Sequence, residues 1–185
     1  MGGDPGSLDG QRVGFGVFIL RCTKKLLDRL PRSGAEDADQ ATSTTRMGDW
    51  TANLFFIGRQ QLVLGVNNTT LLPVLLPIAP NKTFIPRFVE AAGEMLMAIG
   101  IEDRKAVLAE MAAMNECIVG PTNDRRVLGT INEFGRMLEV YLDGRALPEV
   151  ALHLAEAPCS PIGMERPRDA ARKRFSAPAL RLVKG

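Results

Sequence analysis

One histidine and three cysteines are the residues of this chain best suited to nucleophilic or metal chemistry: His153, Cys22, Cys117 and Cys159. They lack the spacing of a zinc site, and no Cys-x-x-Cys motif occurs, so we predict no metal and no cofactor. Cys22 ends an apolar run just before a predicted helix that Thr23 can cap. The N-terminus of a helix lowers the pKa of a nearby thiol, so Cys22 could be a nucleophile, with His153 as its base. The alternative, which we favour, is a buried thiol and a structural histidine.

Polar residues inside or beside apolar segments are a second group of candidates. The run 123–126 opens a predicted helix, whose exposed N–H groups and guanidinium groups could hold a phosphate or carboxylate; the alternative is a capped helix with a solvated first turn. The candidates for such an anionic or polar site are Arg21, Asn53, Asn123 and Arg126. Buried amides and guanidinium groups require hydrogen-bond partners. These residues, with Asn67, Asn68 and Asn132, therefore form either one network between the hairpin and the long helix, which we favour, or the lining of a polar pocket.

The C-terminal residues carry the strongest local charge. Residues 165–185 hold seven basic and two acidic side chains, a net charge of +5, whereas residues 1–164 carry −3. Clustered Lys and Arg can contact phosphates, so Arg172, Lys173 and Arg174 are candidates for nucleic-acid contacts. The alternative is a solvated, disordered tail, which is at least as plausible for this composition.

The composition is that of a globular protein: 185 residues, 45% apolar and 24% charged, with a net charge of +2. This balance excludes a wholly disordered, collagenous or membrane-bundle chain. The apolar run 13–20 is too short and wrongly flanked for a signal peptide, and the run 71–80 contains three prolines and is too short for a membrane helix. We therefore expect a cytoplasmic protein with a flexible N-terminus (1–15), a single domain (16–164) and a basic, disordered tail (165–185).

Apolar patterning places the elements that must position these residues. It predicts a buried strand over 17–22 and a helix over 24–30, a loop over 32–48, and a β-hairpin over 50–57 and 62–66. After it, a short helix is expected to begin at Thr69 or Thr70 and to break at Pro73 or Pro77. Helices are predicted over 85–99, from Asp103, from Asn123 or Asp124, and over 147–155, with a further strand at 117–119. This order indicates an α+β fold: a small antiparallel or mixed sheet covered on one face by three to five helices.

Four blocks of this sequence resemble a family of small bacterial proteins known only as a domain of unknown function. The blocks are 21–28, 50–56 with 67–70, 123–134 and 159–163. The resemblance covers about residues 18–165, leaves both ends outside, and implies no activity, ligand or catalytic residue.

Two functions are compatible with these observations. We favour a non-enzymatic binding or regulatory protein that acts through a protein or nucleic-acid partner, because catalytic signatures are missing and the tail is basic. The alternative is a small enzyme acting on an anionic substrate in a polar cleft formed by Arg21, Asn53, Asn123 and Arg126. No membrane association is predicted by either function.

Overall fold

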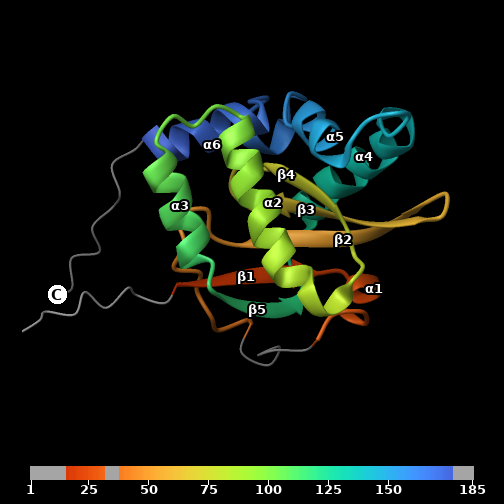
Figure 1. Ribbon diagram of the computed structural model, residues 1–185, viewed down its shortest axis with the longest axis horizontal. Coiled ribbons are helices and arrows are strands. Elements are labelled where there is room, and N and C mark those ends of the chain that lie inside the picture. The colour runs from red at the N-terminus through yellow and green to blue at the C-terminus, as the bar shows by residue number, and fades with distance from the viewer. Residues whose placement is uncertain (1–15, 32–37, 177–185) are drawn as a thin grey trace, which may run out of the picture.

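A five-stranded mixed sheet lies at the centre of the computed structural model, which describes residues 16–31 and 38–176 (Figure 1). The strands are β1 (Val17–Cys22), β2 (Trp50–Ile57), β3 (Gln60–Asn67), β4 (Pro73–Pro77) and β5 (Glu116–Pro121), in the order β4-β3-β2-β1-β5. Strand β1 runs parallel to β2 and to β5, whereas β3 is antiparallel to both of its neighbours, β2 and β4. The predicted α+β class, the hairpin and the late strand are thus confirmed.

In the described parts of the chain, six helices and two single 3₁₀ turns surround the sheet. They are α1 (Lys24–Leu27), η1 (Asn81–Thr83), α2 (Phe84–Ala98), α3 (Arg104–Ala113), α4 (Arg125–Tyr141), α5 (Leu147–Leu154), η2 (Ser160–Ile162) and α6 (Pro167–Ser176). The caps follow the sequence: the Asp103 side chain accepts from Ala106 N, and the Asp124 side chain accepts from Arg126 N and Val127 N. Within the described residues, no helix is long and apolar enough to cross a membrane.

The helices cover both faces of the sheet rather than the single face predicted. On one face, Phe88 of α2 packs with ring-centroid distances of 6.3 Å to Phe18 and 5.4 Å to Trp50. On the other face, Gly135 of α4 lies so close to the ring of Phe55 that an added Cβ would be 2.2 Å from it. Trp50 and Phe55 are an odd number of residues apart on β2, so they point to opposite faces. Helices α5 and α6 lie beyond the β4 edge (Figure 1).

The segment after β3 is a strand and not the short helix predicted from its threonines. The Asn67 side chain accepts hydrogen bonds from Thr69 N and Thr70 N, and this turn reverses the chain. Strand β4 then pairs antiparallel with β3 at the edge of the sheet. Pro73 and Pro77 lie at its two ends, where prolines are tolerated because an edge strand has N–H groups that need no partner strand.

The prediction of a disordered tail from residue 165 is wrong for residues 167–176, which form α6. Its buried residues Pro167, Ala171 and Phe175 recur every fourth position and form one apolar stripe. Proline and alanine are weak signals of an apolar stripe, so the many basic side chains of this segment favour the prediction of a disordered tail. Residues 1–15 and 177–185, predicted as a flexible N-terminus and as the rest of the tail, lie outside the described residues.

Candidate functional site

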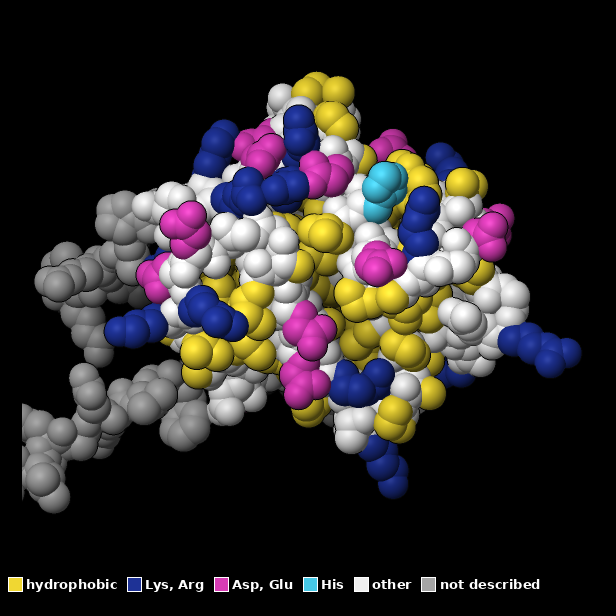
Figure 2. Space-filling model, turned by 45° about the horizontal axis from the view of Figure 1, so that its top comes forward, with side chains coloured by type: hydrophobic (Ala, Val, Ile, Leu, Met, Phe, Trp, Pro, Cys, Tyr) yellow, Lys and Arg dark blue, Asp and Glu magenta, His cyan; other side chains and the backbone are white. Residues whose placement is uncertain are grey.

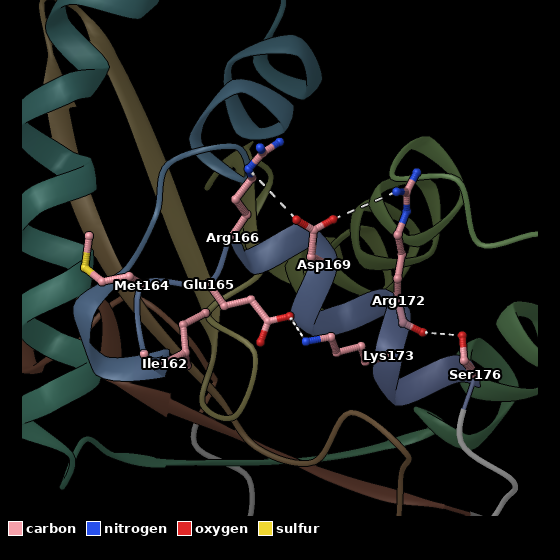
Figure 3. Close-up of a pocket in the computed structure, with 9 residues that line it drawn as sticks. Ile162, Met164, Glu165, Arg166, Asp169, Arg172, Lys173 and Ser176 are labelled. Atoms are coloured by element: carbon pink, nitrogen blue, oxygen red, sulfur yellow. Dashed lines mark hydrogen bonds and ion pairs between the residues drawn. The ribbon is translucent and has the colours of Figure 1, made fainter.

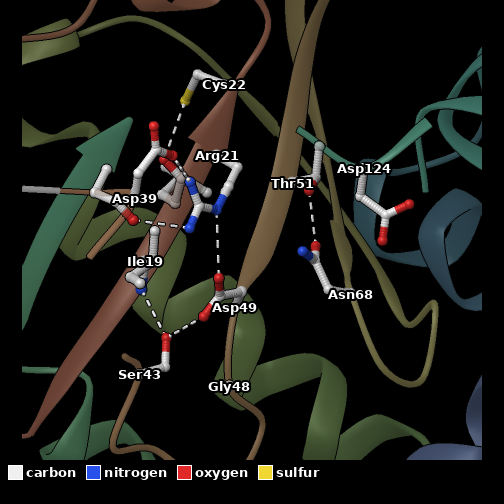
Figure 4. A network of polar contacts seen from close by, with 12 residues as sticks. Ile19, Arg21, Cys22, Asp39, Ser43, Gly48, Asp49, Thr51, Asn68 and Asp124 are labelled. Carbon is white, nitrogen blue, oxygen red and sulfur yellow. Dashed lines mark hydrogen bonds and ion pairs between the residues drawn. The ribbon is translucent and has the colours of Figure 1, made fainter. Parts of the chain in front are cut away.

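Arg21 is buried and its guanidinium group is bonded on several sides (Figure 4). It extends from β1 on the face opposite Phe18, and its side chain is only 7% exposed. Arg21 donates to the carbonyl of Ala38 at 2.8 Å, to Asp39 at 3.1 Å and to Asp49 at 3.4 Å. Because these three acceptors come from the loop before β2, Arg21 holds that loop against the sheet.

The contacts of Asp49 continue this network toward α4. The backbone N of Asn68 donates to the carbonyl of Asp49 at 2.9 Å, and the Thr51 hydroxyl donates to the Asn68 side chain at 2.7 Å. The guanidinium of Arg126 donates to the Asn68 carbonyl at 2.9 Å and lies 3.6 Å from Asp124. Arg21 and Arg126 therefore belong to one chain of polar contacts that joins the loop, the hairpin and the long helix.

The other two anion-site candidates lie apart from these contacts. Asn53 accepts from the Thr23 hydroxyl at 2.7 Å, so this threonine binds the hairpin with its side chain instead of capping α1. Asn123 is exposed, and its side chain makes no hydrogen bond to the described residues. Arg21 and Arg126 thus share one chain of contacts, whereas Asn53 and Asn123 each have separate surroundings.

The thiols have environments that suppress nucleophilic reactivity. Cys22 is 1% exposed and donates to the Leu20 carbonyl, and burial raises its pKa well above the ordinary value. Burial likewise raises the pKa of Cys117 to about 12 and that of Cys159 to about 11. The proposed base, His153, is exposed on α5, where its ring lies edge-on to Tyr141 at 4.4 Å. No three His, Cys, Asp or Glu side chains among the described residues are grouped so that they could bind a metal.

The three candidates for nucleic-acid contacts on α6 differ in how they bond to the rest of the protein. Arg172 donates through Nε to the carbonyl of Ile99 at the end of α2, and Arg174 donates through Nε to the carbonyl of Arg46. Lys173 is 75% exposed and lies 2.7 Å from Glu165, which raises its pKa. Two of the three candidates therefore attach α6 to the body of the molecule, and Lys173 extends from its surface.

Buried Glu110 was not anticipated, yet it connects α3 to the loop that α6 packs against. Its two carboxylate oxygens accept from Arg46 N and Met47 N, both at 2.8 Å. Burial raises the pKa of Glu110, whereas these backbone hydrogen bonds lower it. The guanidinium of Arg46 lies 5.1 Å from the centre of the Phe175 ring. A single glutamate in an amphipathic helix gives no sequence signal for this role.

Two adjoining hollows flank α6 and share Arg172 and Ser176. Figure 3 shows the one that Ile162 and Met164 border. The larger, of about 690 Å³, is bordered by Ile162, Met164 and Glu165; the smaller, of about 470 Å³, is bordered by residues 100–103. Neither is lined by the four anion-site candidates Arg21, Asn53, Asn123 and Arg126.

Acidic side chains are distributed among the basic ones of this face. Asp169 lies 3.9 Å from each of Arg166, Arg168 and Arg172, and Glu156 pairs with Arg166 and Arg168. Figure 2 accordingly shows basic and acidic side chains mixed over the part of the molecule that α5 and α6 form. The described part of the segment, residues 165–176, carries five basic and two acidic side chains, a net charge of +3, and Glu156 lowers the charge of this face further.

Comparison with known protein families gives a match over most of the chain. A family model described as "Domain of unknown function (DUF6933)" matches residues 19–170. The match includes the four blocks singled out in the sequence and extends into α6. Neither the curated proteins nor the solved structures give a match.

Proposed function

The chain belongs to this family of unknown function, and we propose that it is a non-enzymatic binding or regulatory protein whose partner docks on the face of α6. The residues best suited to catalysis lie in environments that favour a binding role over an enzymatic one. The thiols have raised pKa values, His153 packs on Tyr141, and Arg21 is bonded to Ala38, Asp39 and Asp49.

The observation that carries the proposal is the pair of hollows that meet at Arg172. The Nε hydrogen bond to Ile99 fixes this side chain, which is 41% exposed, and its Nη1 lies 3.9 Å from Asp169, too far for a hydrogen bond. An arginine held in this way loses little conformational freedom on binding a carboxylate. Met164 adds an apolar contact beside it, because it is 63% exposed. Arginine and methionine are both enriched at protein interfaces.

The charge distribution favours a protein partner over a nucleic acid on this face. Nucleic-acid binding through charge depends on Lys and Arg side chains that are free to replace the counterions of phosphates. Here Glu156, Glu165 and Asp169 already pair with the basic side chains of the helix. A protein segment that presents one carboxylate to Arg172 and apolar groups to Met164 fits the face better.

Site-specific photo-cross-linking in cells of the source organism tests this proposal. A cross-linking amino acid at Met164 should give a discrete adduct with one protein, whereas the same group at Val140, which is 71% exposed on α4, should not. With that protein purified, Met164→Asp should weaken binding at least about tenfold, an effect of about 1.4 kcal/mol, and Val140→Asp should leave it unchanged. Asp tolerates the backbone of residue 164, whose φ is +62°. Equal cross-linking from both positions, or an affinity insensitive to Met164→Asp, would refute the proposal.

A further inference from the structure

Basic side chains from three separate parts of the sequence gather at one end of the sheet. This hairpin-end surface comprises the outer side of α1, the turn between β2 and β3, and η1, and its exposed basic side chains are Lys24, Lys25, Arg29, Arg59 and Lys82. The acidic side chain within it, Asp28, pairs with Lys24 at 3.3 Å. In Figure 1 the β2–β3 turn projects from the body of the molecule, and α1 lies at the same end.

Hydrogen bonds join these three parts. Arg29, which follows α1, donates to the Gln61 side chain on β3 at 3.3 Å and accepts at its carbonyl from the Asn81 side chain at 3.0 Å. Lys25 donates to the Leu54 carbonyl on β2 at 3.5 Å. The basic side chains therefore belong to one surface, although they lie up to 58 residues apart in the sequence.

An exposed aromatic ring lies on this surface beside Lys25. Phe56 is 49% exposed, whereas Phe18, Phe84 and Phe88 are fully buried. The ammonium group of Lys25 lies 5.4 Å from the centre of the Phe56 ring. An exposed aromatic ring is unfavourable in water. Because it lies beside a cation, this surface could stack a planar group on the ring and bind an anion at the ammonium group.

We propose that the hairpin-end surface binds single-stranded nucleic acid, with a base stacked on Phe56 and phosphates contacting Lys25, Arg29 and Lys82. Proteins that bind single strands combine a positively charged surface with aromatic side chains on which bases stack. Unlike on the α6 face, the acidic side chain that the described residues place on this surface, Asp28, pairs with a lysine at its margin. An acidic peptide or an anionic membrane would use the charges but would not require base stacking on the ring. The proposal concerns a different surface from the protein-binding face and goes beyond it.

Fluorescence anisotropy with the full chain and labelled oligo(dT) or oligo(U) of about 12 nucleotides tests the proposal. Binding should weaken steeply between about 50 and about 200 mM salt. Phe56→Ala should weaken it about 5- to 150-fold, the range for loss of one base–aromatic stack, and Phe56→Trp should retain it. Lys25→Gln should lower the slope of log affinity against log salt by about one.

The matched controls lie on α3, at the other end of the molecule (Figure 1). Leu108→Ala removes a side chain that is 60% exposed, and Lys105→Gln removes an exposed charge; neither should change the affinity. The proposal fails if the oligonucleotides do not bind, if Phe56→Ala matches Leu108→Ala, or if Phe56→Trp fails to retain binding while its far-UV circular dichroism is native. It also fails if poly-glutamate or phosphatidylserine vesicles bind as tightly as the oligonucleotides.

Discussion

Replacing Asp49 by alanine tests the interpretation of the Arg21 network as a structural element. Arg21 bonds two carboxylates with very different exposure: the Asp49 side chain is 27% exposed and the Asp39 side chain is 75% exposed. Breaking a buried ion pair by removing one partner costs about 3–5 kcal/mol, because the other charge is left in the interior. Partial access of water to Asp49 reduces the expected loss to about 2–3 kcal/mol. Asp39→Ala should cost less than about 1 kcal/mol, as for an exposed pair.

Urea unfolding provides the measurement, because the single tryptophan reports on the core. Trp50 is fully buried and lies edge-on to Phe88, so its fluorescence should change when the sheet separates from α2. The free energy of unfolding follows from linear extrapolation, with an unchanged m-value as the check on comparability. Equal losses for Asp49→Ala and Asp39→Ala would refute the argument from burial.

A double-mutant cycle separates the ion pair from other effects of Asp49. The Ser43 hydroxyl also donates to this carboxylate, at 2.5 Å, so part of the loss is independent of Arg21. In an Arg21→Met background no buried cation remains, and Asp49→Ala should then cost about 1 kcal/mol. The expected coupling energy is therefore about 1–2 kcal/mol. A coupling energy near zero would show that Arg21 and Asp49 do not stabilise one another.

Three further measurements test the packing and the thiols. Gly129→Ala should raise the free energy of unfolding by about 1 kcal/mol, because nothing lies within 4 Å of an added Cβ in this helical position. Gly135→Ala should lower it by about 1–3 kcal/mol, because the added Cβ would collide with the Phe55 ring. A change of the same sign for both substitutions would contradict this packing. Phe175→Ala should lower it by about 3 kcal/mol, since Phe175 is 8% exposed, and a loss below about 1 kcal/mol would show that α6 contributes little packing. The raised pKa of Cys159, about 11, leaves about one thiolate in a thousand at about pH 8, so its alkylation in the native protein should accelerate about tenfold per pH unit up to about pH 10. Rapid native labelling at about pH 8 would contradict that environment.

The elements that the sequence predicts correctly are those marked by residues within the element or directly beside it. Asp103 and Asp124 precede amphipathic runs and do cap α3 and α4, and the two apolar runs around Gly58 do form a hairpin. The position of β5 beside β1 has no such signal, because it pairs residues about 100 positions apart, such as Val17 and Glu116. Nothing in either strand's composition specifies that neighbour.

The Arg21 network could be predicted in kind but not in its members. A buried guanidinium must have acceptors, so a network was the favoured interpretation of the sequence. The acceptors are Asp39 and Asp49, which lie 18 and 28 residues away. Both occur in a polar stretch without periodicity, and the path of that loop, rather than its composition, decides which carboxylates reach Arg21.

Charge patterning shows how a count along the chain can mislead about a surface. The +5 of residues 165–185 already counts Glu165 and Asp169, which lie beside Lys173 and Arg172 once α6 packs, and Glu156 from outside the segment adds a further carboxylate. The hairpin-end surface contains no comparable basic run, yet its cations converge from α1, the β2–β3 turn and η1. Electrostatic attraction of a polyanion depends on charge density in space, since solvent screens exposed charges beyond about 10 Å. The two proposed surfaces should therefore respond independently: Met164→Asp should spare oligonucleotide binding, and Phe56→Ala should spare the protein partner.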